Sequence, residues 1–247
     1  MLRMLCITAH PDDEAGGFGG SLALYAARGV ETFVVCLTPG QAASHRGNTR
    51  SEQELIARRR EEFATSCRIL GVAEGEVLDY RDAALDRTNF YEVASDLARR
   101  IRQIQPHVVA TFGPEGALTA HADHSMASIF ATAAYHWAGR SNRFTDQLTN
   151  GLRPYRPQKL YYTTASFTLP ERQPVSLPPA TTAIDISDYW QQKLNAFRAH
   201  TTQTPLFPIF EKNVSSSGCL ELFHLAAAIT PRQIELETDL LSGVTDE

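Results

Sequence analysis

Short, continuous apolar runs alternate with segments of helical periodicity along the first 140 residues of this chain. The apolar runs are typical of strands buried on both faces, and they lie at residues 2–9, 31–38, 76–80 and 107–113. The helical segments lie at residues 16–29, 51–71, 89–105 and from about 123 to 139. This alternation predicts an α/β fold in which a mostly parallel sheet lies between two layers of helices.

The chain is expected to form a single domain over residues 1–247, because no linker, repeat or low-complexity tract divides it. The pattern weakens after residue 140. The segment 140–247 is interpreted as covering or extending the sheet, and its predicted elements are a strand within 157–167, a proline-rich loop at 171–182 and a helix within 185–200.

Composition argues against several classes of partner. The net charge of −5 leaves no basic surface for nucleic acid, since the densest basic run, Arg58–Arg60, is followed by two acids. No apolar stretch approaches the roughly 20 residues of a membrane span. The four cysteines lack CxxC spacing and are interpreted as free thiols. We therefore expect a cytoplasmic protein with a small-molecule ligand, and leave a homo-oligomer open.

Three polar clusters follow predicted strands: AHPDDE at 9–14, LTPGQ at 37–41 and GPEGALTAHADH at 113–124. Because ligands of parallel sheets bind outside the carboxyl ends of the strands, these clusters are expected to meet at one edge. Acids at the end of a buried strand repel one another and resist leaving water, and a cation between them removes both objections. The glycines in GGFGG, 16–20, do not form GxGxxG and are expected to allow close packing of a helix.

The pairing of HPDD, 10–13, with HADH, 121–124, predicts a metal site. A catalytic zinc takes three nitrogen or oxygen ligands from the protein and keeps one position open for water. The alternative interpretation is that each motif is a capped helix start with Asp12 or Asp123 as the cap. Two such motifs at two predicted strand ends favour the metal site.

AHPDDE after an N-terminal strand, with HxDH after a later strand, resembles the LmbE/PIG-L family of metal-dependent de-N-acetylases. The resemblance covers residues 1 to about 137, and KLNAFRAHTTQ at 193–203 resembles the K-x-x-A-x-x-x-H-x-x-Q segment of the family. Members remove acetyl groups from substrates that contain N-acetylglucosamine. The resemblance implies a three-layer, Rossmann-like (LmbE-like) fold.

The resemblance also implies roles for individual residues. His10, Asp13 and His124 would bind one divalent metal ion, with Zn²⁺ expected and ferrous iron left open. Asp12 would be the general base, and His121 would stabilise the oxyanion or protonate the leaving amine. The sequence does not indicate whether Asp12 or His121 donates the proton to the leaving amine.

Two further acids flank these residues. Asp123 is expected to orient an imidazole, because ligand and catalytic histidines need an acceptor for their second nitrogen. Glu14 is interpreted as a supporting residue that bonds the backbone of the loop.

Substrate contacts are predicted at Arg59, Asp82 and Gln41. Arg59 fits the helix pattern of the family, with a solvated arginine as the alternative, and Asp82 lies where members bond sugar hydroxyls. Gln41 replaces the glutamate that many members carry after T-x-G. His200 and Gln203 are expected either to line the entrance or to pack the last helix.

Other departures concern the second motif, where HADH lacks the proline of HPDH and Thr119 stands at a position that is aromatic in some relatives. They put the usual substrates in doubt and leave the metal chemistry intact. The predicted function is a zinc-dependent hydrolase that removes an N-acetyl or other N-acyl group from an N-acetylglucosamine-type conjugate with a metal-activated water. The alternatives are an amidase or esterase for a non-sugar acyl group and a non-catalytic sugar-binding protein.

Overall fold

The computed structural model describes residues 1–169, 175–216, 219–230 and 236–245. The strands in this part of the chain are β1 (Arg3–Thr8), β2 (Glu31–Cys36), β3 (Glu74–Val77), β4 (Val108–Phe112), β5 (Lys159–Thr164), β6 (Thr182–Asp185) and β7 (Leu220–Ala228). The α-helices are α1 (Asp13–Ala27), α2 (Glu52–Leu70), α3 (Phe90–Ile104), α4 (Ala122–Ala138), α5 (Thr145–Thr149), α6 (Trp190–Arg198) and α7 (Phe207–Ser216).

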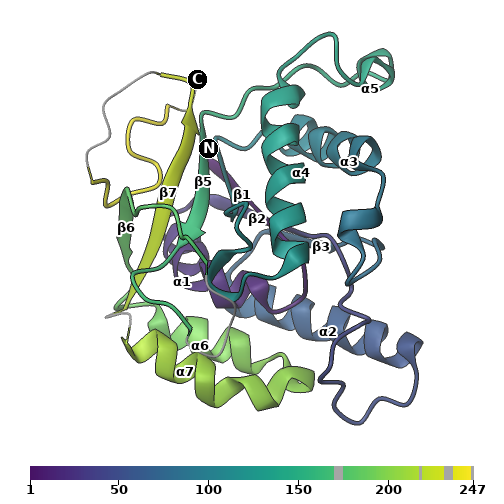
Figure 1. Cartoon of the computed structure of the whole chain (residues 1–247). Helices are drawn as coiled ribbons and strands as arrows, with labels where there is room; N and C mark the ends of the chain where they lie inside the picture. The colour runs from purple at the N-terminus through teal and green to yellow at the C-terminus, as the bar shows by residue number, and fades with distance from the viewer. Residues whose placement is uncertain (170–174, 217–218, 231–235, 246–247) are drawn as a thin grey trace.

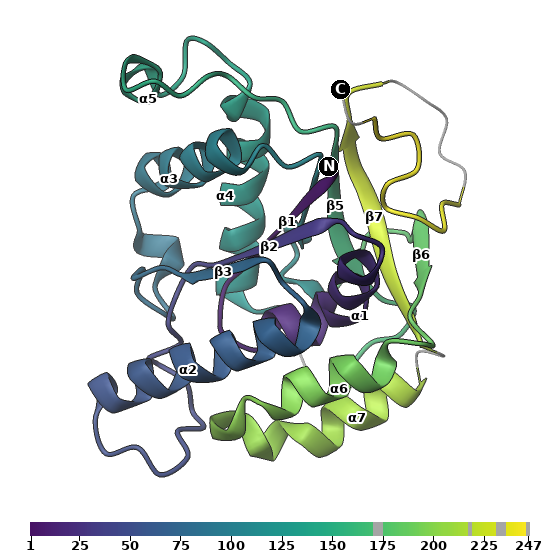
Figure 2. The same cartoon turned by 180° about the vertical axis from the view of Figure 1, so that it is seen from behind.

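One sheet contains all of these strands, in the order β3-β2-β1-β4-β5-β7-β6. The five neighbouring strands β3, β2, β1, β4 and β5 run parallel to one another. Strand β7 runs antiparallel to both β5 and β6. Helices α1, α2 and α6 pack together on one face, and α3 packs against α4 on the other (Figures 1 and 2). The predicted α/β fold with a mostly parallel sheet is confirmed.

Three of the four apolar runs become inner strands of this sheet, whereas the run predicted at 76–80 only overlaps β3, which starts at Glu74, lies at the sheet edge and is mostly exposed. Every residue of β4 is buried, and β1 is buried from Met4 to Thr8. Strand β1 pairs with β2 on one side and with β4 on the other, so the strand order reverses at β1. The carboxyl ends of β1 and β4 therefore form a switch point, which is the usual ligand position in open α/β sheets.

Local signals account for both ends of α2. The Ser51 side chain accepts a hydrogen bond from the Glu54 backbone amide, and Gly71 ends α2 in a left-handed conformation. Helix α1 begins at Asp13, earlier than the predicted 16–29. Carboxylates are favourable in a first helical turn because of the helix dipole, and this turn contains two.

The sequence did not predict β6, β7, α5 or α7. In β7 the apolar Leu220 is exposed whereas the acidic Glu221 is buried, so polarity does not mark which face is inside. Residues 171–174 of the predicted proline-rich loop lie outside the described residues, and Thr182 already belongs to β6. No helix in the described part of the chain combines the length and apolarity needed to cross a lipid bilayer.

The predicted close packing of the glycine-rich helix start occurs at Gly20. A Cβ at Gly20 would lie 2.5–2.7 Å from three atoms of the buried Ile186, whereas at Gly17 the nearest atom, Thr163 Cγ2, is 4.0 Å away. We expect Gly20→Ala to lower the free energy of unfolding by about 1–3 kcal/mol through overpacking. Gly17→Ala is the control and should be neutral or stabilising, since alanine favours the helix. Urea denaturation of both variants measures this, and equal stabilities would contradict the tight contact.

Candidate active site

The loops that follow β1 and β4 bring two histidines together at the carboxyl edge of the sheet. His10 comes directly after β1, and the segment after β4 leads through a short 3-10 helix, Ala117–Thr119, to His124 in α4. The ring centroids of His10 and His124 lie 5.4 Å apart. Residues far apart in the sequence meet because β1 and β4 are neighbouring strands.

Carboxylates surround the His10 ring on both sides. Its Nδ1 lies 3.4 Å from Asp13 Oδ2, and its Nε2 lies 3.1 Å from Asp82 Oδ1 and 3.3 Å from Asp123 Oδ2. Burial alone would lower the pKa of His10, but hydrogen bonds to these carboxylates, above all to Asp123, raise it well above its usual range. The two acids at Nε2 favour a proton on that nitrogen, so Nδ1, which faces Asp13, is the ring nitrogen that can exchange its proton for a cation.

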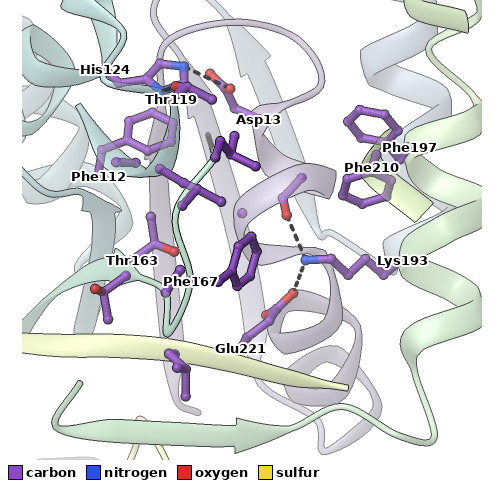
Figure 3. A pocket seen from close by; sticks show the side chains of 18 of the residues that line it. Asp13, Phe112, Thr119, His124, Thr163, Phe167, Lys193, Phe197, Phe210 and Glu221 are labelled. Atoms are coloured by element: carbon purple, nitrogen blue, oxygen red, sulfur yellow. Dashed lines mark hydrogen bonds and ion pairs between the residues drawn. The ribbon is translucent and has the colours of Figure 1, made fainter. Parts of the chain in front are cut away.

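His124 approaches Asp13 from the other side. Its Nε2 lies 3.1 Å from Asp13 Oδ1, its Nδ1 lies 3.2 Å from the Thr119 hydroxyl, and its ring stacks on Phe112 with 4.0 Å between centroids (Figure 3). Burial would raise the pKa of Asp13, but the charges and hydrogen bonds of the two imidazoles hold it well below its usual range. Thr119, considered in the sequence only as a substrate position, thus contacts the second nitrogen of His124.

The atoms around Asp13 suit a divalent cation. A carboxylate oxygen faces a ring nitrogen on each side, and two imidazoles with one carboxylate are the ligand set of many catalytic zinc sites. A lone pair and a carboxylate that face each other repel unless a proton or a cation lies between them, so the residues fit a metal ion. Among the described residues, two groups have ligand atoms that all lie within 4.8 Å of one another: His10, His121 and His124, and His10, Asp82 and Asp123.

Asp12 lies beside this cluster in a strained conformation. Its φ of 122° is left-handed, which costs a non-glycine residue about 1–3 kcal/mol and is found mainly at functional sites. Its Oδ2 lies 3.1 Å from Arg59 Nη2. Burial, helped by Asp13 and opposed by Arg59, raises the pKa of Asp12 to about 6. A carboxyl group that titrates near neutrality is suited to general acid–base catalysis.

His121 is the N-cap residue of α4, and its ring is fixed by that position. Its Nδ1 accepts a hydrogen bond of 3.1 Å from the Asp123 backbone amide. The proton of the neutral ring is therefore on Nε2. Burial and the neighbouring imidazoles of His10 and His124 lower the pKa of His121, so the neutral form prevails near pH 7. The residue is exposed and offers one N–H donor at the site.

Asp123 and Asp82 both contact His10. Asp123 is 1% exposed and accepts hydrogen bonds from the backbone amides of Ala83 and Leu85, so the imidazole it orients is that of His10. Asp82 contacts His10 through Oδ1, and its Oδ2 accepts a hydrogen bond of 2.8 Å from the backbone amide of Ala42. These contacts tie the loops after β2 and β3 to the first motif.

The other two predicted substrate residues are buried. Arg59 is 3% exposed and donates to the backbone carbonyls of Gly40, at 3.0 Å, and Pro11, so it is not a solvated helix arginine. Gln41 is 5% exposed. Among the described residues, Arg59 Nε and Gln41 Oε1 are buried atoms with no hydrogen-bond partner. A buried polar atom without a partner costs about 1–3 kcal/mol unless a ligand or a water bonds it.

A second buried polar group lies behind the site. Glu14 accepts hydrogen bonds from the Asp12 amide at 3.0 Å and from the Ser66 hydroxyl at 2.5 Å, and lies 2.7 Å from His200 Nε2. Glu14 thus bonds the loop backbone, as the sequence suggested. His200 and Gln203, at 0% and 4% exposed, pack the interior and do not line an entrance.

Comparisons with known proteins agree with this geometry. Residues 5–135 match the model of the GlcNAc-PI de-N-acetylase (PIG-L) family. Diacetylchitobiose deacetylase of Thermococcus kodakarensis is 33% identical over 205 residues, which cover 82% of this chain and 70% of that protein. A 1D-myo-inositol 2-acetamido-2-deoxy-alpha-D-glucopyranoside deacetylase of Catenulispora acidiphila is 28% identical, covering 98% of this chain and 97% of that protein.

A solved structure is also similar over most of its length. N,N'-diacetylchitobiose deacetylase of Pyrococcus horikoshii superimposes with a TM-score of 0.77 at 28% identity, covering 93% of this chain and 86% of that one. Matching sequence, matching fold and the paired histidine–aspartate motifs lead to one assignment. This chain belongs to the PIG-L family of de-N-acetylases.

Proposed function

We propose that this chain is a metal-dependent hydrolase that removes the N-acyl group from an amino sugar conjugate of the N-acetylglucosamine type. One observation carries the proposal: two imidazoles converge on the Asp13 carboxylate beside Asp12, a carboxyl group with a pKa of about 6, at the switch point of the sheet. The related deacetylases of Thermococcus and Catenulispora, whose names specify acetylated amino sugars, support this substrate class.

His10, Asp13 and His124 would hold the metal. His10 would use Nδ1, because its Nε2 is engaged by Asp82 and Asp123, and His124 would use Nε2, because its Nδ1 contacts Thr119. When bound, a divalent cation, zinc by this ligand set, supplies a water of lowered pKa and polarises the scissile carbonyl.

Asp12 acts as the general base and then as the acid. Its carboxylate accepts the proton of the attacking water, and a pKa of about 6 lets the same group pass that proton to the departing amine near neutral pH. Arg59 keeps the carboxylate in place from 3.1 Å.

His121 stabilises the charge that develops on the acyl oxygen. Its Nδ1 is occupied as the helix cap, so Nε2–H is the atom that donates. The lowered pKa of His121 keeps its ring neutral, which supports Asp12 as the proton donor to the amine.

Gln41, Asp82 and Arg59 would face the sugar. The buried Gln41 Oε1 and Arg59 Nε, which no other described residue bonds, support this role. Strands β5, β7 and β6 continue the sheet that β1 to β4 begin, which supports a single domain over residues 1–247.

The activity is tested by acetate release from a panel that includes N-acetylglucosamine, N,N'-diacetylchitobiose and an N-acetylglucosaminyl inositol. We expect release from at least one sugar, loss of activity with a chelator and recovery with Zn²⁺. Asp12→Asn should keep the metal but lower kcat by about 10²- to 10⁴-fold, because an amide cannot accept the proton. Release only from non-sugar amides or esters would indicate the alternative hydrolase, and sugar binding without release would indicate a binding protein.

Metal analysis tests the ligand set. The wild type should bind about one divalent ion, and His10→Ala, Asp13→Ala and His124→Ala should each lose most of it. His121→Asn should keep the metal, since asparagine can still cap α4, while kcat falls by about 10²- to 10³-fold through loss of the oxyanion donor.

Plasma emission spectrometry beside steady-state kinetics measures both quantities and identifies the native metal. Loss of metal in His121→Asn would place His121 in the ligand set. An unchanged kcat would reduce its role to capping the helix.

A further inference from the structure

A cavity of about 510 Å³ opens from the predicted metal ligands and extends away from them beneath α6 and α7. Asp13 and His124 line its inner end, and the paired rings of Phe197 and Phe210 lie at the far side (Figure 3). The cavity is thus continuous with the position of the scissile bond.

The walls beyond the ligands are mainly apolar. Phe112 and Leu222 come from the sheet, Ile209 and Phe210 come from α7, and the Phe197 ring stacks on that of Phe210 with 3.8 Å between centroids. Ligand pockets of this size are commonly lined mainly by apolar side chains, and walls of this kind can cover an apolar part of a ligand.

The two charged residues deep in the cavity neutralise each other. Lys193 Nζ lies 2.5 Å from Glu221 Oε1 and donates to the Gly16 carbonyl at 2.8 Å. The Glu221 carboxylate also accepts the backbone amides of Gly20 and Ser21, each at 2.8 Å. Because the two charges compensate each other, this pair adds no net charge that would attract a charged ligand.

The surroundings of the predicted metal ligands are polar on one side and apolar on the other, and the order of the strands sets which side is which. Gln41 follows β2 and Asp82 follows β3, on one side of β1. The cavity lies on the other side, over β4, β5 and β7, where it is lined by Phe112, Thr163 and Leu222. When the substrate amide lies at the predicted metal ligands, its acyl group and its sugar point away from the scissile bond in different directions. If the sugar lies towards Gln41 and Asp82, the acyl group points into the cavity.

An acetyl group is too small for this space. It has three heavy atoms and would fill only a small part of a cavity of about 510 Å³. The remaining apolar surface would stay unused or hold poorly bonded water. A chain of several methylene groups would cover it and gain from its own burial.

We propose that the cavity receives a linear acyl chain longer than acetyl, so that the enzyme is a de-N-acylase of lipid-modified amino sugars; this rests on the proposed function. In the reaction, the water oxygen bonds to the acyl carbon and the carbon–nitrogen bond breaks. The nitrogen takes up one proton of the water as this bond breaks and a second when the acid product ionises, so that the amine leaves as an ammonium group. The products are a fatty carboxylate and a free amino sugar.

The test is a series of N-acyl glucosamines from acetyl to decanoyl, assayed by release of the free amine. We expect kcat/KM to rise by at least about tenfold from acetyl to octanoyl, since each methylene in an apolar pocket contributes to discrimination. Octanoate should also inhibit better than acetate, as the product that fills the cavity.

Two isoleucines of similar exposure provide matched variants. Ile209 lines the cavity and is 43% exposed, whereas Ile129 lies on α4 outside the residues that line it and is 41% exposed. Ile209→Asn should lower the octanoyl-to-acetyl ratio of kcat/KM by about tenfold, and Ile129→Asn should leave that ratio unchanged. Gly17→Leu, which places a branched side chain where a Cβ would meet only Thr163, should reduce octanoyl turnover more than acetyl turnover.

Each contrary outcome has a separate meaning. Efficient acetyl hydrolysis that declines with chain length would overturn the acyl cavity and leave the proposed function intact. A preference for octyl glycosides of N-acetylglucosamine over N-octanoyl glucosamine would assign the cavity to the group on the sugar hydroxyl, and would overturn the proposal equally. If no N-acyl amino sugar is hydrolysed, the proposed function itself fails.

Discussion

Three carboxylates from three separate segments are buried around the imidazole of His10. Because Asp13, Asp82 and Asp123 are buried, their negative charges repel one another strongly. Each carboxylate accepts a hydrogen bond from a backbone amide and also contacts the His10 ring. The loops after β1, β2, β3 and β4 are consequently positioned relative to one side chain. A positive charge within the cluster, as a proton or a metal ion, relieves the repulsion and makes the arrangement favourable.

The position of this cluster at the switch point has a chemical consequence. The strands on one side of β1 end in loops with polar side chains, and the strands beyond β4 form the floor of an apolar cavity. In the proposed function, a substrate with a polar amine portion and an apolar acyl portion would use both sides, with its scissile bond beside the proposed base Asp12. The order of strands, as well as the identity of the proposed metal ligands, would then shape which conjugates fit.

The C-terminal segment is held to the site by buried ionic groups. Lys193 on α6 pairs with Glu221 on β7, and His200 after α6 pairs with Glu14 in the first turn of α1. Removing one member of such a pair leaves the other charge uncompensated, at a cost of about 3–5 kcal/mol. Glu14 also accepts a hydrogen bond from the backbone amide of Asp12, the proposed base. The packing of α6 therefore affects the position of that base.

Local sequence predicted most of the parallel core, because short apolar runs that alternate with helical segments are typical of inner strands, and the ends of such strands share one edge. It also determined where α2 begins and ends, through the Ser51 cap and the left-handed Gly71. Three things were decided only by tertiary structure: the inward direction of Glu221 in β7, the contact of Asp123 with His10, and the apolar cavity. Each depends on which segments pack side by side, and a burial pattern or a contact between distant segments is a property of that packing and not of local residue order.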